Sequence, residues 1–146
     1  MSVKSALYDE DFYAWSNQQA ALLRSGQSGL ADLERIAEEI ESMGKTELRE
    51  LTSRLKVLLL HLLKWQYQPK GRSSSWQASI RVQRYDIRVH MKANPSLKAK
   101  VAEAITDAYY TAVIEAGEET NLPETTFPDS CPYAFDQIMD EAFWPK

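Results

Sequence analysis

The chain holds 146 residues, of which 44% are hydrophobic and 26% charged, and its formal net charge is −4. These totals are typical of an ordinary globular protein, and we predict a single helical domain over residues 1–146 with its own buried core. The small net charge gives no general argument for binding nucleic acid or a membrane. Five glycines and six prolines are few, which favours helices over a turn-rich β fold.

The sequence shows no sign of export or membrane insertion. No apolar run approaches the roughly 20 residues that a membrane span needs, and Met1–Tyr8 lacks the basic-then-apolar layout of a signal peptide. The single cysteine, Cys131, has no second cysteine for an internal disulfide, which suits a reducing compartment. We therefore expect a cytoplasmic protein without a membrane partner.

The first predicted helix is recognised by its ends. Asp9 or Asp11 caps it, and it ends near Ser25 because Gly26 is a helix stop.

A second helix is predicted from Leu30 to about Tyr67, where apolar residues recur at helical spacing. The phase of this stripe continues through Gly44, which favours one long helix of about 55 Å. A compact domain of this size is only about 40 Å across. Either Gly44 breaks the helix, or one end protrudes and is covered by a partner.

A third helix follows the stop at residues 69–71, with a cap among the serines at 73–75 and an end near Ala93. One face carries Trp76, Ile80, Ile87 and Met91, the opposite face carries Ala78, Val82, Tyr85 and Val89, and a stripe of Arg81, Arg84 and Arg88 lies between them. A helix that is apolar on two sides is either central in a bundle or makes an oligomer contact.

Two more helices complete the prediction. Asn94-Pro95 starts a fourth helix that ends before Asn121, and Pro132 opens a last helix that reaches about Phe143. The fold class is therefore all-α, with about five helices in a bundle organised around a long antiparallel hairpin of the second and third helices.

Six short motifs occur in order along the chain: YDEDFYAW (8–15), EEIESMG (38–44), LLLHLLKWQYQP (58–69), RSSSW (72–76), NPSL (94–97) and FPDSCPY (127–133). In these the chain resembles the bacterial family catalogued as domain of unknown function 29, over nearly its whole length. The resemblance implies an all-helical single domain with no established activity and no assigned catalytic residues.

Charge is strongly segregated along the chain. Residues 1–53 hold five Lys/Arg and ten Asp/Glu, residues 54–100 hold eleven Lys/Arg and one acid, and residues 101–146 hold one Lys and ten acids. The basic third includes the corner between the second and third helices, where an anionic ligand would bind. The candidate ligand-binding residues are His61, Lys64, Trp65, Arg72, Trp76, Arg81 and Arg84.

Three interpretations of this corner stay open, the third of which is a surface for a protein partner. Guanidinium groups bind phosphate or carboxylate bidentately, and tryptophans stack on bases or other rings, so the ligand would be phosphorylated or a nucleic acid. Alternatively, the hairpin places Glu47 and Glu50 opposite Arg88 and Lys92, and the acidic last helices neutralise the remaining cations. We favour the second interpretation because structural ion-pair networks are common.

No catalytic constellation is found. His61 lies among leucines, as a packed histidine does, and Cys131 has no histidine near it in sequence. Glu34, Glu38 and Glu41 share a helix face without the histidine motif of di-metal bundles. There is no phosphate-binding glycine loop, zinc spacing or serine elbow, so we predict no catalytic residue, no metal and no cofactor.

The expected function is therefore that of a non-enzymatic helical interaction or regulatory module that self-associates or binds a protein partner. The alternative is a binding protein or enzyme acting on an anionic ligand at the arginine and tryptophan corner. Nucleic acid is a possible but not a favoured partner.

Overall fold

The structure, a computed structural model, describes residues 3–146, with side chains from residue 6 onward. Its described part contains six α-helices and four short 3-10 turns, without strands. None of these helices combines the length and the apolar character needed to cross a membrane. The chain divides into two compact units, Met1–Thr46 and Glu47–Lys146, which are described separately. One domain over residues 1–146 stays a prediction.

The first unit contains α1 (Val3–Glu10), α2 (Phe12–Arg24) and the first turns of α3. The Asp11 carboxylate accepts a hydrogen bond from the Ala14 backbone N–H at 3.0 Å and caps α2. Gly26 follows the helix with φ +76°, a conformation that favours glycine. The predicted cap and stop are therefore confirmed, whereas α1 was not predicted because eight residues are too short to show a clear apolar period.

Aromatic side chains join these three helices. The rings of Tyr8 and Trp15 meet edge to face with their centroids 4.9 Å apart, and Phe12 packs against both. The Tyr8 hydroxyl donates a hydrogen bond to the Glu39 carboxylate of α3, and the Arg35 guanidinium lies 4.6 Å above the Tyr8 ring. Three of the four aromatic residues of the YDEDFYAW motif, Tyr8, Phe12 and Trp15, thus pack together in this unit, whereas Tyr13 is exposed.

Helix α3 (Leu33–Tyr67) is continuous and has Gly44 in its interior. Glycine costs about 1 kcal/mol relative to alanine in such a position, which is small beside the contribution of a well-packed helix. The helix begins three residues later than predicted because Ser28–Leu30 form the 3-10 turn η1. The expectation of one unbroken helix is confirmed.

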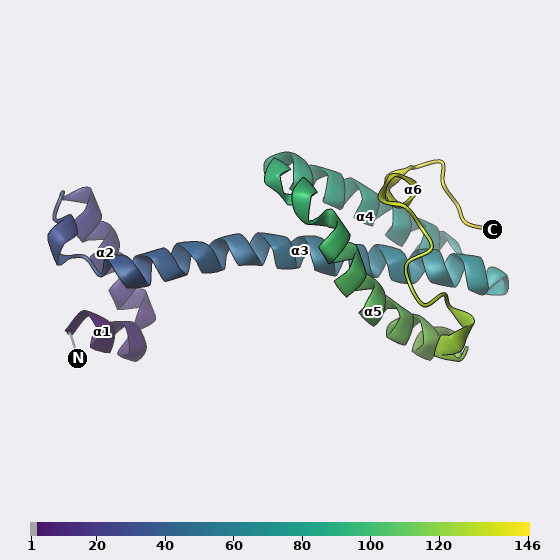
Figure 1. The fold of residues 1–146 in the computed structure, drawn as a ribbon, viewed down its shortest axis with the longest axis horizontal. Coiled ribbons are helices and arrows are strands. Elements are labelled where there is room, and N and C mark those ends of the chain that lie inside the picture. The colour runs from purple at the N-terminus through teal and green to yellow at the C-terminus, as the bar shows by residue number, and fades with distance from the viewer. Residues whose placement is uncertain (1–2) are drawn as a thin grey trace. The chain divides into compact units, whose positions relative to one another are not determined.

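In the second unit, α4 (Ser74–Ala93) runs antiparallel to α3 after the 3-10 turn η2 (Pro69–Gly71) (Figure 1). Arg54 of α3 pairs with Asp86 of α4 at 3.1 Å, and Glu50 pairs with His90 at 2.9 Å. Residue numbers rise along one helix as they fall along the other, which confirms the predicted hairpin.

Helix α5 (Val101–Thr120) packs on the same part of α3 and runs in the same direction. Lys56 and Lys64 of α3 pair with Glu115 and Glu119 of α5 at 3.2 and 2.9 Å. The predicted fourth helix is α-helical only from Val101, because residues 95–100 form the 3-10 turn η3.

The core of the second unit lies where these three helices meet. Burying a leucine or isoleucine stabilises the fold by about 1.5–3 kcal/mol, and alanines let α5 approach α3 closely. The fully buried side chains include Leu51, Leu55, Leu58, Leu59, Leu62, Leu63, Ile80, Ile87, Ala108, Ala112 and Ala116.

After α5 the chain returns across the other helices through the 3-10 turn η4 (Glu124–Thr126) and α6 (Phe135–Met139). The prediction of a last helix from Pro132 to about Phe143 is wrong, since α6 has five residues. Tyr133 is buried instead, and its hydroxyl donates to the Gln66 side-chain oxygen at 2.6 Å. Tertiary contacts thus hold the chain extended on either side of α6.

Candidate functional site

Helix α4 is apolar on two sides, as its sequence predicts. Ile80 and Ile87 face the core and are fully buried. On the opposite side, Val82, Tyr85 and Val89 are 50–62% exposed. Together with Ala78 they are spaced 4, 3 and 4 residues apart, which is the spacing of a helix that packs on another helix. We call this set, with the flanking Arg81, Arg88 and Lys92, the basic α4 face.

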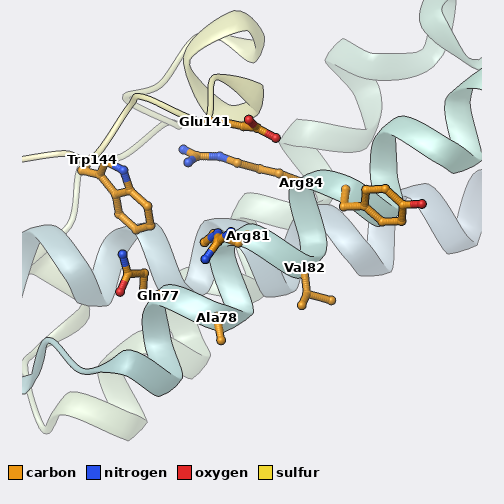
Figure 2. A pocket seen from close by; sticks show the side chains of 8 residues that line it. Gln77, Ala78, Arg81, Val82, Arg84, Glu141 and Trp144 are labelled. Carbon is orange, nitrogen blue, oxygen red and sulfur yellow. The ribbon is translucent and has the colours of Figure 1, made fainter.

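A cavity of about 610 Å³ adjoins this face, and Figure 2 shows the side chains that line it. One wall comes from α4 and the other from the segment after α6. Its lining residues are Gln77, Ala78, Arg81, Val82, Arg84, Tyr85, Glu141 and Trp144.

Arg84 is the most unusual residue of the cavity because it is a buried cation, only 1% exposed. Its Nε donates to the Ile138 carbonyl oxygen at 2.7 Å, and Nη2 donates to that of Phe143 at 2.8 Å. Its Nη1 is buried and has no hydrogen-bond partner in the described part of the chain. Burial lowers the pKa of Arg84, partly offset by the charges of Asp140 and Glu141.

Neither arginine of the cavity forms an ion pair among the described residues, and Arg81 makes no hydrogen bond there either. Figure 2 shows the Arg84 guanidinium extending between Glu141 and Trp144, and its Cζ lies 5.5 Å from the indole centroid. The Glu141 carboxylate is held by Arg88 at 3.3 Å. The cavity lining therefore contains two cationic side chains and one anionic side chain.

The other predicted ligand-binding residues make contacts outside the cavity. Lys64 is buried, with Nζ 2.9 Å from Glu119 and 4.6 Å from the Trp76 ring centroid. Arg72 donates from Nε to the Trp65 carbonyl oxygen at 2.7 Å and lies over the Trp65 ring. None of these four residues lines the cavity, so the corner predicted from sequence is largely a packed junction.

Trp65 also contacts Trp144, with the ring centroids 4.8 Å apart. His61 is half-buried on α3, where its Nδ1 lies 2.8 Å from the Val57 carbonyl oxygen. Burial lowers the pKa of His61. Of the seven predicted residues, the structure brings only Arg81 and Arg84 together in the cavity.

The predicted neutralisation of the basic third is only partly correct. Lys56 and Lys64 are paired with acids of α5, as expected. Glu50, however, pairs with Arg54 and His90 rather than with Arg88 or Lys92. For Arg72, Arg81 and Arg84 the expected pairing is wrong, because none of them forms an ion pair with a described carboxylate.

Sequence reasoning missed Gln77, Glu141 and Trp144 as cavity residues. On a helical wheel Gln77 lies next to the arginine stripe, but nothing in the sequence around it indicates a functional role. The adjacent aromatic pair Phe143 and Trp144, after two acids, was a signal for a buried contact, though not for its location. The return of the chain over α4 depends on tertiary packing.

Within the described part of the chain, one group of side chains has metal-ligand geometry: the candidate donor atoms of Glu47, Glu50 and His90 lie within 4.8 Å of one another. Both ring nitrogens of His90 already face acceptors, Nδ1 the Glu50 carboxylate and Nε2 the Glu47 carbonyl oxygen at 2.9 Å. These hydrogen bonds account for the arrangement. The absence of a metal and a cofactor stays a prediction.

Cys131 lacks the features of an activated thiol. Its Sγ donates to the Tyr133 carbonyl oxygen at 3.5 Å, and burial raises the pKa of the thiol. A raised pKa disfavours the reactive thiolate.

Helix α5 has an exposed face of the opposite charge. Tyr110 is 72% exposed and Ile114 is also exposed, and both line a shallow hollow of about 290 Å³ together with Glu124 and Asp129. Three further exposed acids, Glu103, Asp107 and Glu118, lie on this side of the helix at spacings of three, four or seven residues from the apolar pair. We call these five α5 residues the acidic α5 face.

These features define a helical protein with a cationic cavity and two oppositely charged exposed faces, without a catalytic constellation in its described part. The chain belongs to the family described as domain of unknown function DUF29, whose profile matches residues 7–144. No curated protein and no solved structure matches the chain significantly.

Proposed function

We propose that this protein is a non-enzymatic helical interaction module that self-associates, with the basic α4 face of one copy packing on the acidic α5 face of another. As a regulatory or scaffolding module it would act in the cytoplasm.

The observation that carries the proposal is the exposure of Val82, Tyr85 and Val89. Burying such side chains between helices removes apolar surface from water at about 25 cal/mol per Å². Their 4-3-4 spacing with Ala78 is that of knobs on a helix that packs lengthwise on a second helix. The exposed Ile40 and Met43 of α3 offer additional apolar surface for a partner.

Charge favours α5 as the opposing surface. Residues 101–145 contain no lysine or arginine, so the acidic α5 face attracts Arg81, Arg88 and Lys92, except near Glu103, which lies 3.9 Å from Lys100. Pairing two α4 faces in antiparallel orientation about their middle would instead bring Arg81 of one copy near Arg88 of the other, which is unfavourable. A contact between two different faces is heterologous and builds rings or chains.

The decisive experiment uses two variants that each disable one face. Arg88→Glu with Lys92→Glu reverses the charge of the basic α4 face, and Glu103→Lys with Asp107→Lys reverses the acidic α5 face. Light scattering and sedimentation should show oligomers for the wild-type chain and monomers for each variant alone. An equimolar mixture should associate again, because the two retained faces are complementary to each other and the two reversed faces are too.

High salt should weaken the association because it screens the charges around the contact. A wild-type chain that stays monomeric at high micromolar concentration contradicts the proposal. A mixture that stays monomeric while wild type associates would reject the pairing of α4 with α5.

The anion-binding alternative remains a second candidate because Arg72, Arg81 and Arg84 have no carboxylate partner in the described chain. Its nucleic-acid version predicts that a labelled single-stranded oligonucleotide binds at low salt and dissociates as salt is raised. Absence of binding at low salt rejects that version.

A further inference from the structure

We infer that the cavity between α4 and the segment after α6 binds a small organic oxyanion, a molecule with a carboxylate or phosphate group on an apolar body. This inference narrows the anion-binding alternative to one cavity and one class of ligand. The cavity lining shares Ala78, Arg81, Val82 and Tyr85 with the basic α4 face, so the ligand and a second copy would compete for these residues.

The first argument is positive charge that is only partly compensated. Arg84 is almost fully buried, yet its hydrogen bonds go to two neutral carbonyl oxygens and its Nη1 has no hydrogen-bond partner in the described chain. Asp140 and Glu141 offset its charge only in part and form no ion pair with it, although proteins usually pair a buried cation directly. Arg81, one turn earlier on the same helix, likewise forms no ion pair with a described acid. An oxyanion in the cavity would supply the missing counter-charge.

The second argument is preorganisation. The two carbonyl contacts hold the Arg84 guanidinium in place before any ligand arrives, so little side-chain entropy is lost on binding. Arg81 is exposed and free to turn toward the ligand. The Arg81 guanidinium offers paired N–H donors that suit the oxygens of carboxylate and phosphate, and Arg84 keeps its Nη1 donors and its charge.

The third argument is the apolar lining. Ala78, Val82, Tyr85 and Trp144 form much of the wall, and a volume of about 610 Å³ lies within the range of small-molecule sites. A free inorganic anion would leave these side chains without contacts. The ligand therefore carries an apolar or aromatic body that packs on Val82 and the Trp144 indole.

Glu141 limits the strength of the site. Its carboxylate lines the cavity and repels an anion, although Arg88 holds it at 3.3 Å. Replacing Glu141 by glutamine removes this repulsion, so affinity for the ligand should rise severalfold.

The test is titration of the full chain with phenyl phosphate and phenylacetate, followed by calorimetry and by NMR of side-chain N–H groups. Inorganic phosphate and benzyl alcohol are the comparison probes. At least one aromatic anion should bind 1:1 and shift the Arg84 Nε–H and Trp144 indole signals. Whichever of the two binds more tightly identifies the anionic group as phosphate or carboxylate.

Arg81→Gln should weaken binding by at least about tenfold, the effect of losing one charged hydrogen-bonding group. Arg49→Gln is the matched control, because Arg49 is exposed on α3 and makes no hydrogen bond or ion pair in the described chain. Arg81 makes no hydrogen bond or ion pair among the described residues, so this variant should fold. The monomeric variant with Glu103→Lys and Asp107→Lys provides a separate check, since neither residue lines the cavity and its Arg84 signal should still respond to the probe.

Three results would overturn the inference. They are no binding of either aromatic anion at about 10 mM, equal binding of benzyl alcohol, and equal effects of Arg81→Gln and Arg49→Gln. Inorganic phosphate that binds as tightly as phenyl phosphate would overturn the requirement for an apolar body.

Discussion

Arg84 of α4 donates from Nε to the carbonyl oxygen of Ile138 in α6 at 2.7 Å. A side chain from the middle of one helix therefore holds the backbone of a five-residue helix 54 positions later. The same guanidinium also holds the Phe143 carbonyl oxygen. This relationship shapes the cavity, because it places Glu141 and Trp144 opposite α4.

Replacing Arg84 by methionine should detach the segment after α6. Two charge-assisted hydrogen bonds are lost, each worth about 1.5–3 kcal/mol. Because the variant no longer buries a charge, part of this loss of stability is recovered. We expect a net loss of about 2 kcal/mol in the free energy of unfolding and faster amide hydrogen exchange over residues 138–145. Urea denaturation and exchange measurements test this, with Arg81→Gln as a control that changes stability by less than about 0.5 kcal/mol. Unchanged exchange in that segment would contradict the role of Arg84.

The pair of buried Lys64 and half-exposed Glu119 should respond unequally to the removal of each partner. Glu119→Gln leaves the buried ammonium without its carboxylate, and we expect a loss of about 1–2 kcal/mol, because Glu119 itself is half exposed. Adding Lys64→Met should recover stability, since an apolar chain then fills the site. Glu115→Gln, which breaks the exposed pair with Lys56, should cost under about 1 kcal/mol. If the double variant is less stable than Glu119→Gln alone, the unpaired Lys64 ammonium does not destabilise the fold.

Two glycines should respond in opposite directions to alanine. A Cβ at Gly71 would lie 2.5 Å from the Trp76 ring, so Trp76 must shift at a cost of about 1–3 kcal/mol. A Cβ at Gly44 meets nothing within 4 Å, and its helical position should be stabilised by about 1 kcal/mol. Thermal unfolding of Gly71→Ala and Gly44→Ala measures both. A stabilised Gly71→Ala would show that Trp76 is not held against the turn.

His61 should make stability fall with acidification. Burial lowers the pKa of His61 in the folded chain, with Lys64 adding to the effect and the Val57 carbonyl and Glu119 opposing it. The unfolded chain therefore binds the proton more readily, and stability is lost as pH falls from about 6.5 toward the lower folded value.

The urea midpoint of wild type should fall between about pH 7.5 and pH 5.5, and His61→Gln should show a smaller fall. His90→Gln is the control for the second histidine. An equal fall in wild type and His61→Gln would mean that other groups cause the pH dependence.

The helices were predictable because their signals are local. The Ser73 hydroxyl accepts a hydrogen bond from the Trp76 backbone N–H at 3.2 Å, as its position before an amphipathic run indicates. The apolar stripe of α3 and the two apolar sides of α4 follow from periodicity alone. The antiparallel hairpin follows from a short connection between two long helices.

The cavity was not predictable in the same way. Both arginines were selected as candidates, but their expected partners were wrong, and Lys64, Trp65, Arg72 and Trp76 form a separate junction. Ion pairs depend on side-chain reach across helices and not on helical phase. Glu50, for example, is taken by Arg54 and His90.

The sequence alone determined the helical class, most helix boundaries, the exposed second stripe of α4 and the segregation of charge, because these properties arise within one helix or one stretch of chain. Only the tertiary structure decided that residues after α6 return over α4, that Arg84 is buried between two carbonyl oxygens, and that Trp144 completes a cavity with Arg81. Those features depend on packing between segments more than 50 residues apart, where no local periodicity operates.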